Sequence, residues 1–216
     1  AFKQFQHDMG VVIDSTESTE PEDIPGDLFD SNIVLSFHAN SDKKKKPGKV
    51  EGDDVPVRRE TEFANLSKID LWRRKLDDSW TGGDGQNMAA FTTTDGKRWA
   101  SVSHYLMSVK FKDPHPAIYD DFSLDSKSEI SRDLDKAKAS LEKKKGKIGK
   151  YHEESKKVSD LDDETRNVYR KDALRFKFNQ NLDMKELLKE TGTAKLVVTR
   201  PKFVDNLLME IRREAS

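Results

Sequence analysis

The sequence predicts a single α-rich α+β domain that follows an acidic arm. Three observations support this prediction: the chain length, the helical spacing of apolar residues in several segments, and a few short apolar runs typical of strands. The chain has 216 residues, which suits one domain with a sizeable core. Amphipathic helices mixed with short strands indicate the α+β class.

The first 32 residues are expected to form an arm outside the domain. They hold eight carboxylates and a single lysine, a net charge of −7. Between Asp14 and Asp27 they contain almost no apolar side chain and two prolines. Such a segment cannot bury enough surface to offset the entropy lost on ordering. We therefore predict an arm over residues 1–32, either ordered by a partner or a disordered tail, and a folded domain over residues 33–216.

The first half of the domain is predicted to hold a strand, a helix and a tight turn. Residues 33–37 form a short apolar run typical of a strand. Residues 60–76 carry an approximate helical stripe of apolar side chains. A glycine-rich turn at 81–85 follows and lacks the pattern of a phosphate-binding loop. Residues 91–94 then run into Asp95-Gly96, which predicts a strand entering a tight turn.

Another helix is predicted soon after this turn. Ser101 is a suitable N-cap, and the apolar residues behind it share one helical face. These residues are Val102, Tyr105, Leu106 and Val109. Pro114 and Pro116 are expected to end the helix. Residues 134–157 are rich in lysine and interrupted by two glycines, which indicates a surface loop.

The last part of the chain is predicted to contain two helices, a strand and a closing helix. Residues 162–181 and 182–190 form the helices, with Gly192 as the C-terminal stop of the second. Residues 195–199 form a strand bounded by a proline. Apolar residues between 204 and 211 repeat the helical spacing, so the domain closes with an amphipathic helix.

The composition excludes several kinds of site. The chain has no cysteine, so it can have neither a disulfide nor a thiolate zinc site nor a cysteine nucleophile. Its five histidines are scattered without metal-ligand spacing, and no glycine fingerprint for a dinucleotide is present. We therefore expect no metal and no cofactor. No apolar run approaches the ~20 residues of a membrane helix, and the acid-rich start does not look like a secretion signal, so we expect a soluble intracellular protein without membrane contact.

The basic residues do not predict a nucleic-acid interface. After the arm, the rest of the chain carries a net charge of +6, which is ordinary for a solvated surface. The four lysines at 43–46 are typical of a solvated loop. Neither feature amounts to the clustered basic stripe that a phosphate backbone requires. Specific nucleic-acid binding is therefore not expected.

A signature lies in the helix that Ser101 caps and just before it. Trp99, His104, Tyr105, Lys110 and Phe111 fall in register with a pattern of Trp, then Glu-His-Tyr, then Lys-Phe. In these residues the chain resembles the NADAR family, also called YbiA-like.

Two further blocks extend the resemblance. Residues 173–181 and 187–197 look like the family's Ala-Leu-Arg-x-Lys-Phe-x-Gln and the Leu-Leu and Ala-Lys-Leu-Val that follow it. Residues 207–212 are similar to its closing helix. The resemblance covers about residues 33–216 and implies a YbiA-like multihelical fold with a few short strands. The insertions and the stretch at 122–126 look most like the branch found in large DNA viruses and protists.

The resemblance implies a reaction that this chain is poorly equipped to perform. Family members are N-glycoside hydrolases that act on ribosylated amine intermediates of riboflavin synthesis or remove ADP-ribose from modified bases. Their reaction passes through an oxocarbenium-like state and needs a carboxylate to stabilise the cation or activate water. The family's candidate is the Glu of Glu-His-Tyr, and this chain has the neutral Ser103 there. Met107 replaces a glutamine whose amide could bind a sugar hydroxyl.

Other departures lie where the family would touch its substrate. The family's Phe-Tyr-Ser is Phe37-His38-Ala39 here, and its glycine-rich loop is missing between Arg200 and Phe203. Its Leu-Ser-Asn-Phe is replaced by a segment that contains Asp77 and Asp78. Either acid could supply a relocated carboxylate, although two adjacent acids are more often an exposed turn.

The resemblance also implies ligand-binding residues, namely Trp99, His104, Tyr105 and Lys110. Their alternative roles are structural: a core aromatic for Trp99, a satisfied semi-buried histidine for His104 and a surface cation for Lys110. We expect a degenerate, catalytically inactive NADAR-like domain that serves as a structural or interaction subunit of a larger viral, organellar or cytoplasmic assembly. The acidic arm and the lysine-rich loops would contact its protein partners. The alternatives are an active N-glycoside hydrolase on ADP-ribosyl or ribosylamine substrates, and a non-catalytic binder of ADP-ribose or a nucleotide.

Overall fold

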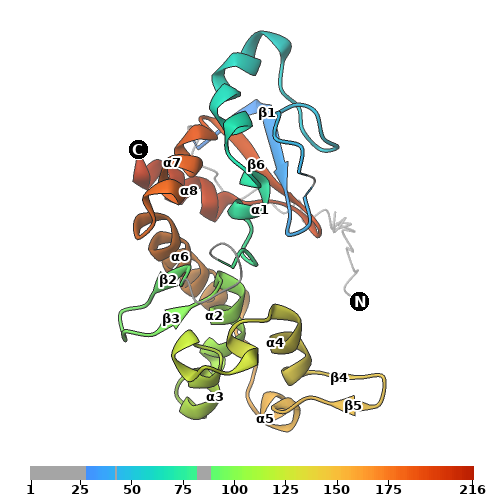
Figure 1. Ribbon diagram of the computed structural model, residues 1–216, viewed down its shortest axis with the longest axis vertical. Coiled ribbons are helices and arrows are strands. Elements are labelled where there is room, and N and C mark those ends of the chain that lie inside the picture. The colour runs from blue at the N-terminus through green and yellow to red at the C-terminus, as the bar shows by residue number, and fades with distance from the viewer. Residues whose placement is uncertain (1–27, 42, 82–88) are drawn as a thin grey trace, which may run out of the picture.

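A three-stranded sheet lies at one end of the domain, and a group of helices lies at the other (Figure 1). The computed structural model describes residues 28–41, 43–81 and 89–216. In the sheet, β1 (Asp30–Phe37) runs parallel to β6 (Ala194–Thr199), and β7 (Lys202–Val204) pairs antiparallel with β6. The described residues therefore form the predicted α-rich α+β domain.

The first strand begins earlier than the apolar run that predicts it. Ile33, Leu35 and Phe37 alternate into the core and are at most 1% exposed. The strand nevertheless starts at Asp30, and Leu28 before it is only 5% exposed. The last residues of the predicted arm thus belong to the domain, and residues 1–27 lie outside the described part of the chain.

The single helix predicted over residues 60–76 is wrong. The segment forms a 3-10 helix, η1 (Val57–Lys68), and a short α-helix, α1 (Trp72–Leu76). Leu71 separates them because its backbone takes a left-handed conformation, with φ at +54°, which a right-handed helix cannot continue through. Each piece buries its own apolar side chains.

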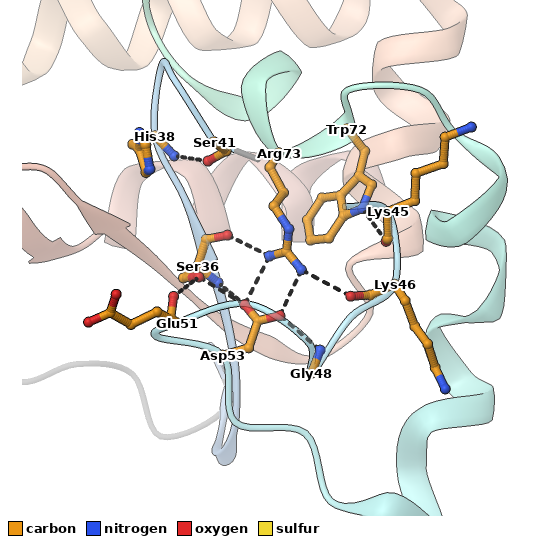
Figure 2. A network of polar contacts seen from close by, with 10 residues as sticks. All are labelled: Ser36, His38, Ser41, Lys45, Lys46, Gly48, Glu51, Asp53, Trp72 and Arg73. Atoms are coloured by element: carbon orange, nitrogen blue, oxygen red, sulfur yellow. Dashed lines mark hydrogen bonds and ion pairs between the residues drawn. The ribbon is translucent and has the colours of Figure 1, made fainter. Parts of the chain in front are cut away.

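A buried ion pair fixes the basic loop at 43–46 to the first strand (Figure 2). Nη1 and Nη2 of Arg73 lie 2.9 and 2.7 Å from the two carboxylate oxygens of Asp53, and both side chains are at most 2% exposed. Arg73 also donates to the carbonyl of Ser36 at 2.7 Å. The indole N–H of Trp72 donates to the Lys45 carbonyl at 2.7 Å, so the basic loop has a defined position.

The predicted turn and the capped helix behind it are confirmed. β2 (Phe91–Thr92) and β3 (Arg98–Trp99) pair antiparallel, and Gly96 takes φ +81° in the turn between them. Ser101 caps α2 (Val102–Ser108), where its Oγ accepts a backbone N–H at 3.2 Å.

The chain turns immediately after this helix. Pro116 lies past its end and begins α3 (Pro116–Asp121), because proline is favoured in the first turn of a helix. Three short 3-10 segments also occur in this region: Val109–Phe111, Leu124–Ser126 and Glu129–Ser131. Of the glycine-rich turn predicted at 81–85, only Thr81 lies within the described residues.

The surface loop predicted over 134–157 is wrong. The segment forms α4 (Leu134–Leu141), a hairpin of β4 (Lys143–Lys144) and β5 (Lys147–Ile148), and α5 (His152–Lys157). The helix α4 forms because the Asp133 carboxylate accepts its first backbone N–H groups at 3.0 Å. The hairpin projects from the lower end of the molecule (Figure 1).

The three C-terminal helices are confirmed. α6 (Asp163–Asn179), α7 (Leu182–Glu190) and α8 (Asn206–Ala215) lie within or close to the predicted bounds. Gly192 takes φ +53° directly after the C-cap of α7, as expected for a helix stop. The long helix α6 packs against α2, α7 and α8 and so connects the two ends of the domain.

Candidate functional site

The loop that follows α1 lies directly against Ser103. The backbone N–H of Ser103 donates to the carbonyl of Asp78 at 2.9 Å. The structure therefore places the backbone of Asp78, one of the two candidate substitute acids, against Ser103, which stands where the NADAR pattern has glutamate. Ser103 and Asp78 are both partly exposed. Whether Asp78 can act as a catalytic carboxylate therefore depends on the partners of its side chain.

The carboxylate of Asp78 is bound on both oxygens by Arg170. Nε and Nη2 of Arg170 lie 2.6 and 3.1 Å from the two oxygens. The same guanidinium binds both oxygens of Asp205 at 2.9 and 2.6 Å. Bidentate, charge-assisted pairs of this kind are among the stronger hydrogen bonds in proteins. Asp78 is consequently an ion-pair partner and not a free base.

The guanidinium of Arg170 is largely buried. The Arg170 side chain is 12% exposed, and that of Asp205 is fully buried. Burial on its own would lower the pKa of Arg170, but the charge of Asp78 and the hydrogen bonds to Asp205 raise it above its ordinary value. Asp205 also accepts the backbone N–H of Leu208 at 3.1 Å as the N-cap of α8. The network thus joins α6, α8 and the loop after α1.

The second candidate carboxylate belongs to a local turn. Oδ1 of Asp77 accepts from the backbone N–H and the hydroxyl of Ser79 at 2.9 and 2.5 Å. This is the arrangement of an Asx-type turn. The carbonyl of Asp77 accepts from Nζ of Lys177 at 2.8 Å. The prediction that two adjacent acids form a turn describes Asp77 well, whereas Asp78 forms the ion pair.

Lys177 is a buried amine beside this loop. It is 1% exposed, and burial lowers its pKa to about 8 despite the nearby Asp78 and Asp77 charges. It also lines a pocket of about 440 Å³. The remaining residues of this pocket are Lys75, Trp80, Ala89, Ala90, Gln180, Asn181, Leu182, Asp183 and Met184. A buried amine with a perturbed pKa at a pocket wall is a typical property of functional sites.

Two of the predicted ligand-binding residues are core aromatics. Trp99 is 0% exposed, and its indole N–H donates to the hydroxyl of Thr93 at 2.9 Å. Its ring lies 5.2 Å from that of Tyr105 and 5.1 Å from that of Tyr119. Tyr105 is 6% exposed, and burial raises its pKa. Both side chains therefore pack the fold.

The other two predicted ligand-binding residues also have structural contacts. His104 is 0% exposed, and its Nδ1 lies 2.8 Å from the hydroxyl of Ser101. Burial lowers the pKa of His104 to about 4, so its ring is neutral at pH 7. Nζ of Lys110 lies 2.6 Å from Asp160 and 3.2 Å from the hydroxyl of Ser155. None of the four predicted residues lines the pocket beside Lys177.

The sequence did not single out Arg170, Lys177 or Asp205 as site residues. Arg170 and Lys177 are seven residues apart on α6, and this spacing places both on one face of the helix. Asp205 precedes an amphipathic helix, which is a recognisable N-cap signal. These signals indicate structure, but only the fold shows that the three residues meet around the loop that holds Asp78.

The wider molecule offers little further guidance. Across the described ranges, no group of three or more His, Asp or Glu side chains is arranged to hold a metal ion. No helix in the described part of the chain is long and apolar enough to cross a bilayer. Comparison of the chain with protein-family models, curated proteins and solved structures finds no match. The resemblance to the NADAR family therefore stays a prediction.

Proposed function

We propose that this chain is a non-catalytic, NADAR-like domain that acts as an interaction subunit of a larger intracellular assembly. The observation that carries the proposal is the state of the carboxylate beside Ser103. Asp78 is held on both oxygens by Arg170, and the same cation is shared with the buried Asp205. The acidic arm would then supply contacts to the protein partners.

The chemistry of N-glycoside cleavage supports this proposal. The sugar becomes cationic as the C–N bond breaks, and an active enzyme places an unpaired carboxylate against it or against the attacking water. Here both oxygens of Asp78 are bound by Arg170, so this carboxylate is not free to stabilise a forming cation or to activate water. Oδ1 of Asp77 is likewise held in its turn by Ser79. Loss of acid–base assistance alone typically costs a factor of about 10²–10⁴.

The predicted ligand-binding residues point the same way. Trp99 and His104 are completely buried, and Tyr105 nearly so. Residues of the signature that pack the fold are kept, while Ser103 and Met107 replace the two that would touch a substrate. This division is what we expect of a domain retained for its shape.

A turnover assay tests the proposal. The full chain is incubated with an ADP-ribosylated oligonucleotide and, separately, with a ribosylated amine intermediate of riboflavin synthesis. We expect no product above the protein-free control from the wild type, Asp77→Asn or Asp78→Asn. Turnover by the wild type that is lost in either variant would establish an active N-glycosidase with a relocated carboxylate.

The pocket beside Lys177 favours a second candidate function, a non-catalytic nucleotide or ADP-ribose binder. Its volume of about 440 Å³ is within the range of small-ligand sites. The amines of Lys75 and Lys177 could meet phosphate, and Trp80 could stack on a base. Calorimetry with ADP-ribose tests this function. Saturable binding that is lost in Trp80→Ala, without product, would support it, and no heat with the wild type would refute it.

A further inference from the structure

The positive charge of the domain is concentrated in one segment. Residues 136–157 hold nine lysines and three glutamates, a net charge of +6. This equals the whole excess carried by residues 33–216, so the rest of the domain is balanced. The segment comprises most of α4, the β4–β5 hairpin and α5. Two of these lysines pair with acids outside the segment, Lys136 with Glu129 and Lys150 with Asp121. Four of the other seven, at 143, 144, 145 and 147, lie in the hairpin.

The hairpin presents its lysines without partners. Lys143, Lys144, Lys145 and Lys147 are all exposed, and none of them forms an ion pair with any residue that the structure describes. Ile148 beside them is 61% exposed. By contrast, in the four-lysine loop at 43–46, Lys45 pairs with Asp70 and Lys46 with Glu60.

The hairpin carries unfavourable features of its own. Lys144 and Lys147 lie directly opposite each other on the paired strands, and like charges in that position are destabilising. Lys145 takes a left-handed conformation at φ +50° beside Gly146 at φ +80°. Both central residues of the two-residue turn thus have positive φ, for which Asn-Gly or Gly-Gly is usual. Lysine at position 145 therefore adds a positive charge to the turn but strains its backbone.

The base of the hairpin is nevertheless firmly held. A Cβ on Gly149 would lie 2.2 Å from the carbonyl oxygen of Ala139, so the chain passes against the end of α4 more closely than any other residue would allow. The N–H of Tyr151 donates to the carbonyl of Ser140 at 2.7 Å, and its hydroxyl donates to Asp121 at 2.6 Å. The lysines are thus displayed on a defined ribbon.

We propose that the β4–β5 hairpin binds the phosphate backbone of nucleic acid without reading its sequence. The four lysines lie on two strands about 4.8 Å apart and in the turn that joins them. Lys144 and Lys147 face each other, Lys143 precedes Lys144, and Lys145 lies in the turn. Duplex DNA carries one phosphate per about 1.7 Å of axis, so a short length offers a phosphate to each ammonium group. Its major groove admits a two-stranded ribbon. The hairpin itself has neither arginine nor amide side chains for bidentate base contacts.

An acidic polypeptide fits this surface less well. The segment 14–27 of this chain, its most acidic stretch, interrupts six acids with eight neutral residues. Its charge is therefore more dilute than that of a phosphate backbone. The proposal is independent of the absence of catalysis, because the hairpin lies apart from the loop that holds Asp78 (Figure 1).

Fluorescence anisotropy with a random-sequence DNA duplex at several salt concentrations tests the proposal on the full chain. Four phosphate contacts predict that log K falls with log salt at a slope of about −3.6. The hairpin variant, with Lys143→Gln, Lys144→Gln, Lys145→Gln and Lys147→Gln, should bind at least tenfold more weakly and with a flatter slope. The matched control, with Lys43→Gln, Lys44→Gln, Lys45→Gln and Lys46→Gln, removes the same charge and should stay within twofold of wild type.

Three results would overturn the proposal. They are no binding by the wild type, equal losses in the two glutamine variants, or displacement of the duplex by polyglutamate at equal charge concentration. The last result would assign the hairpin to an acidic protein. Thermal melting of both variants accompanies the assay, and the hairpin variant should melt no lower than wild type because it loses the Lys144–Lys147 repulsion.

Discussion

Replacing Arg170 with glutamine is expected to destabilise the fold by about 3–5 kcal/mol, the usual cost of removing one partner from a buried ion pair. Arg170 makes four hydrogen bonds of 2.6–3.1 Å to two carboxylates. Without it, Asp205 keeps a negative charge on a fully buried side chain, and Asp78 keeps one on a side chain that is 24% exposed. Glutamine can donate to one of the two carboxylates but neutralises neither.

The same two helices provide the matched control. Arg175 lies on α6 and binds both oxygens of Glu214 on α8 at 2.8 Å, but these side chains are 39% and 41% exposed. Exposed pairs contribute about 0–1 kcal/mol, so Arg175→Gln should cost no more than that.

Urea unfolding followed by circular dichroism measures both variants. For a chain of this length, about 3–5 kcal/mol corresponds to a melting temperature lower by about 6–20 °C. If Arg170→Gln and Arg175→Gln cost the same, Arg170 is not an essential counter-ion of the buried Asp205.

Three further outcomes follow from the structure. Asp53→Asn should cost about 3–5 kcal/mol in urea unfolding, because it leaves the buried Arg73 without its counter-ion, while the exposed neighbour Asp54→Asn should cost little. The pKa of His104 is lowered to about 4 in the folded chain. As the pH falls, the histidine of the unfolded chain is therefore protonated before that of the folded chain. Stability should therefore fall by about 3 kcal/mol from pH 7 to pH 4 on account of this group, and His104→Gln should show a shallower fall in the same titration. Lys144→Gln should raise stability by about 0.2–1 kcal/mol by removing a like-charge pair, and an unchanged or lower urea midpoint would argue against the repulsion.

The helices with a clear apolar period could be predicted from the sequence. The prediction failed where it relied on composition and not on local signals such as helix caps. Apolar spacing and capping residues that are local in the sequence predict four of the helices, namely α2, α6, α7 and α8. The helix α4 lies in a lysine-rich stretch that was predicted to be a loop because glycines interrupt it; the N-cap at Asp133, which marks the start of the helix, was not part of that prediction. The glycines instead form the hairpin turn and its base.

The candidate site was less predictable because it is assembled across the whole chain. The loop that holds Asp77 and Asp78 could be placed near Ser103 from the resemblance. The pairing of Asp78 with Arg170 and Asp205 joins positions 92 and 35 residues apart, and no local pattern predicts it. Burial of Trp99 and His104 likewise follows from packing that a single sequence does not reveal.

The most direct test of the central claim is a single-turnover measurement with the wild-type chain in molar excess over an ADP-ribosylated oligonucleotide. Under these conditions even one slow cleavage per protein is detected, and product release cannot mask it. We expect free ADP-ribose to stay at the level of spontaneous hydrolysis over many hours. A first-order release that depends on protein and is abolished by Asp78→Asn would contradict the absence of catalysis.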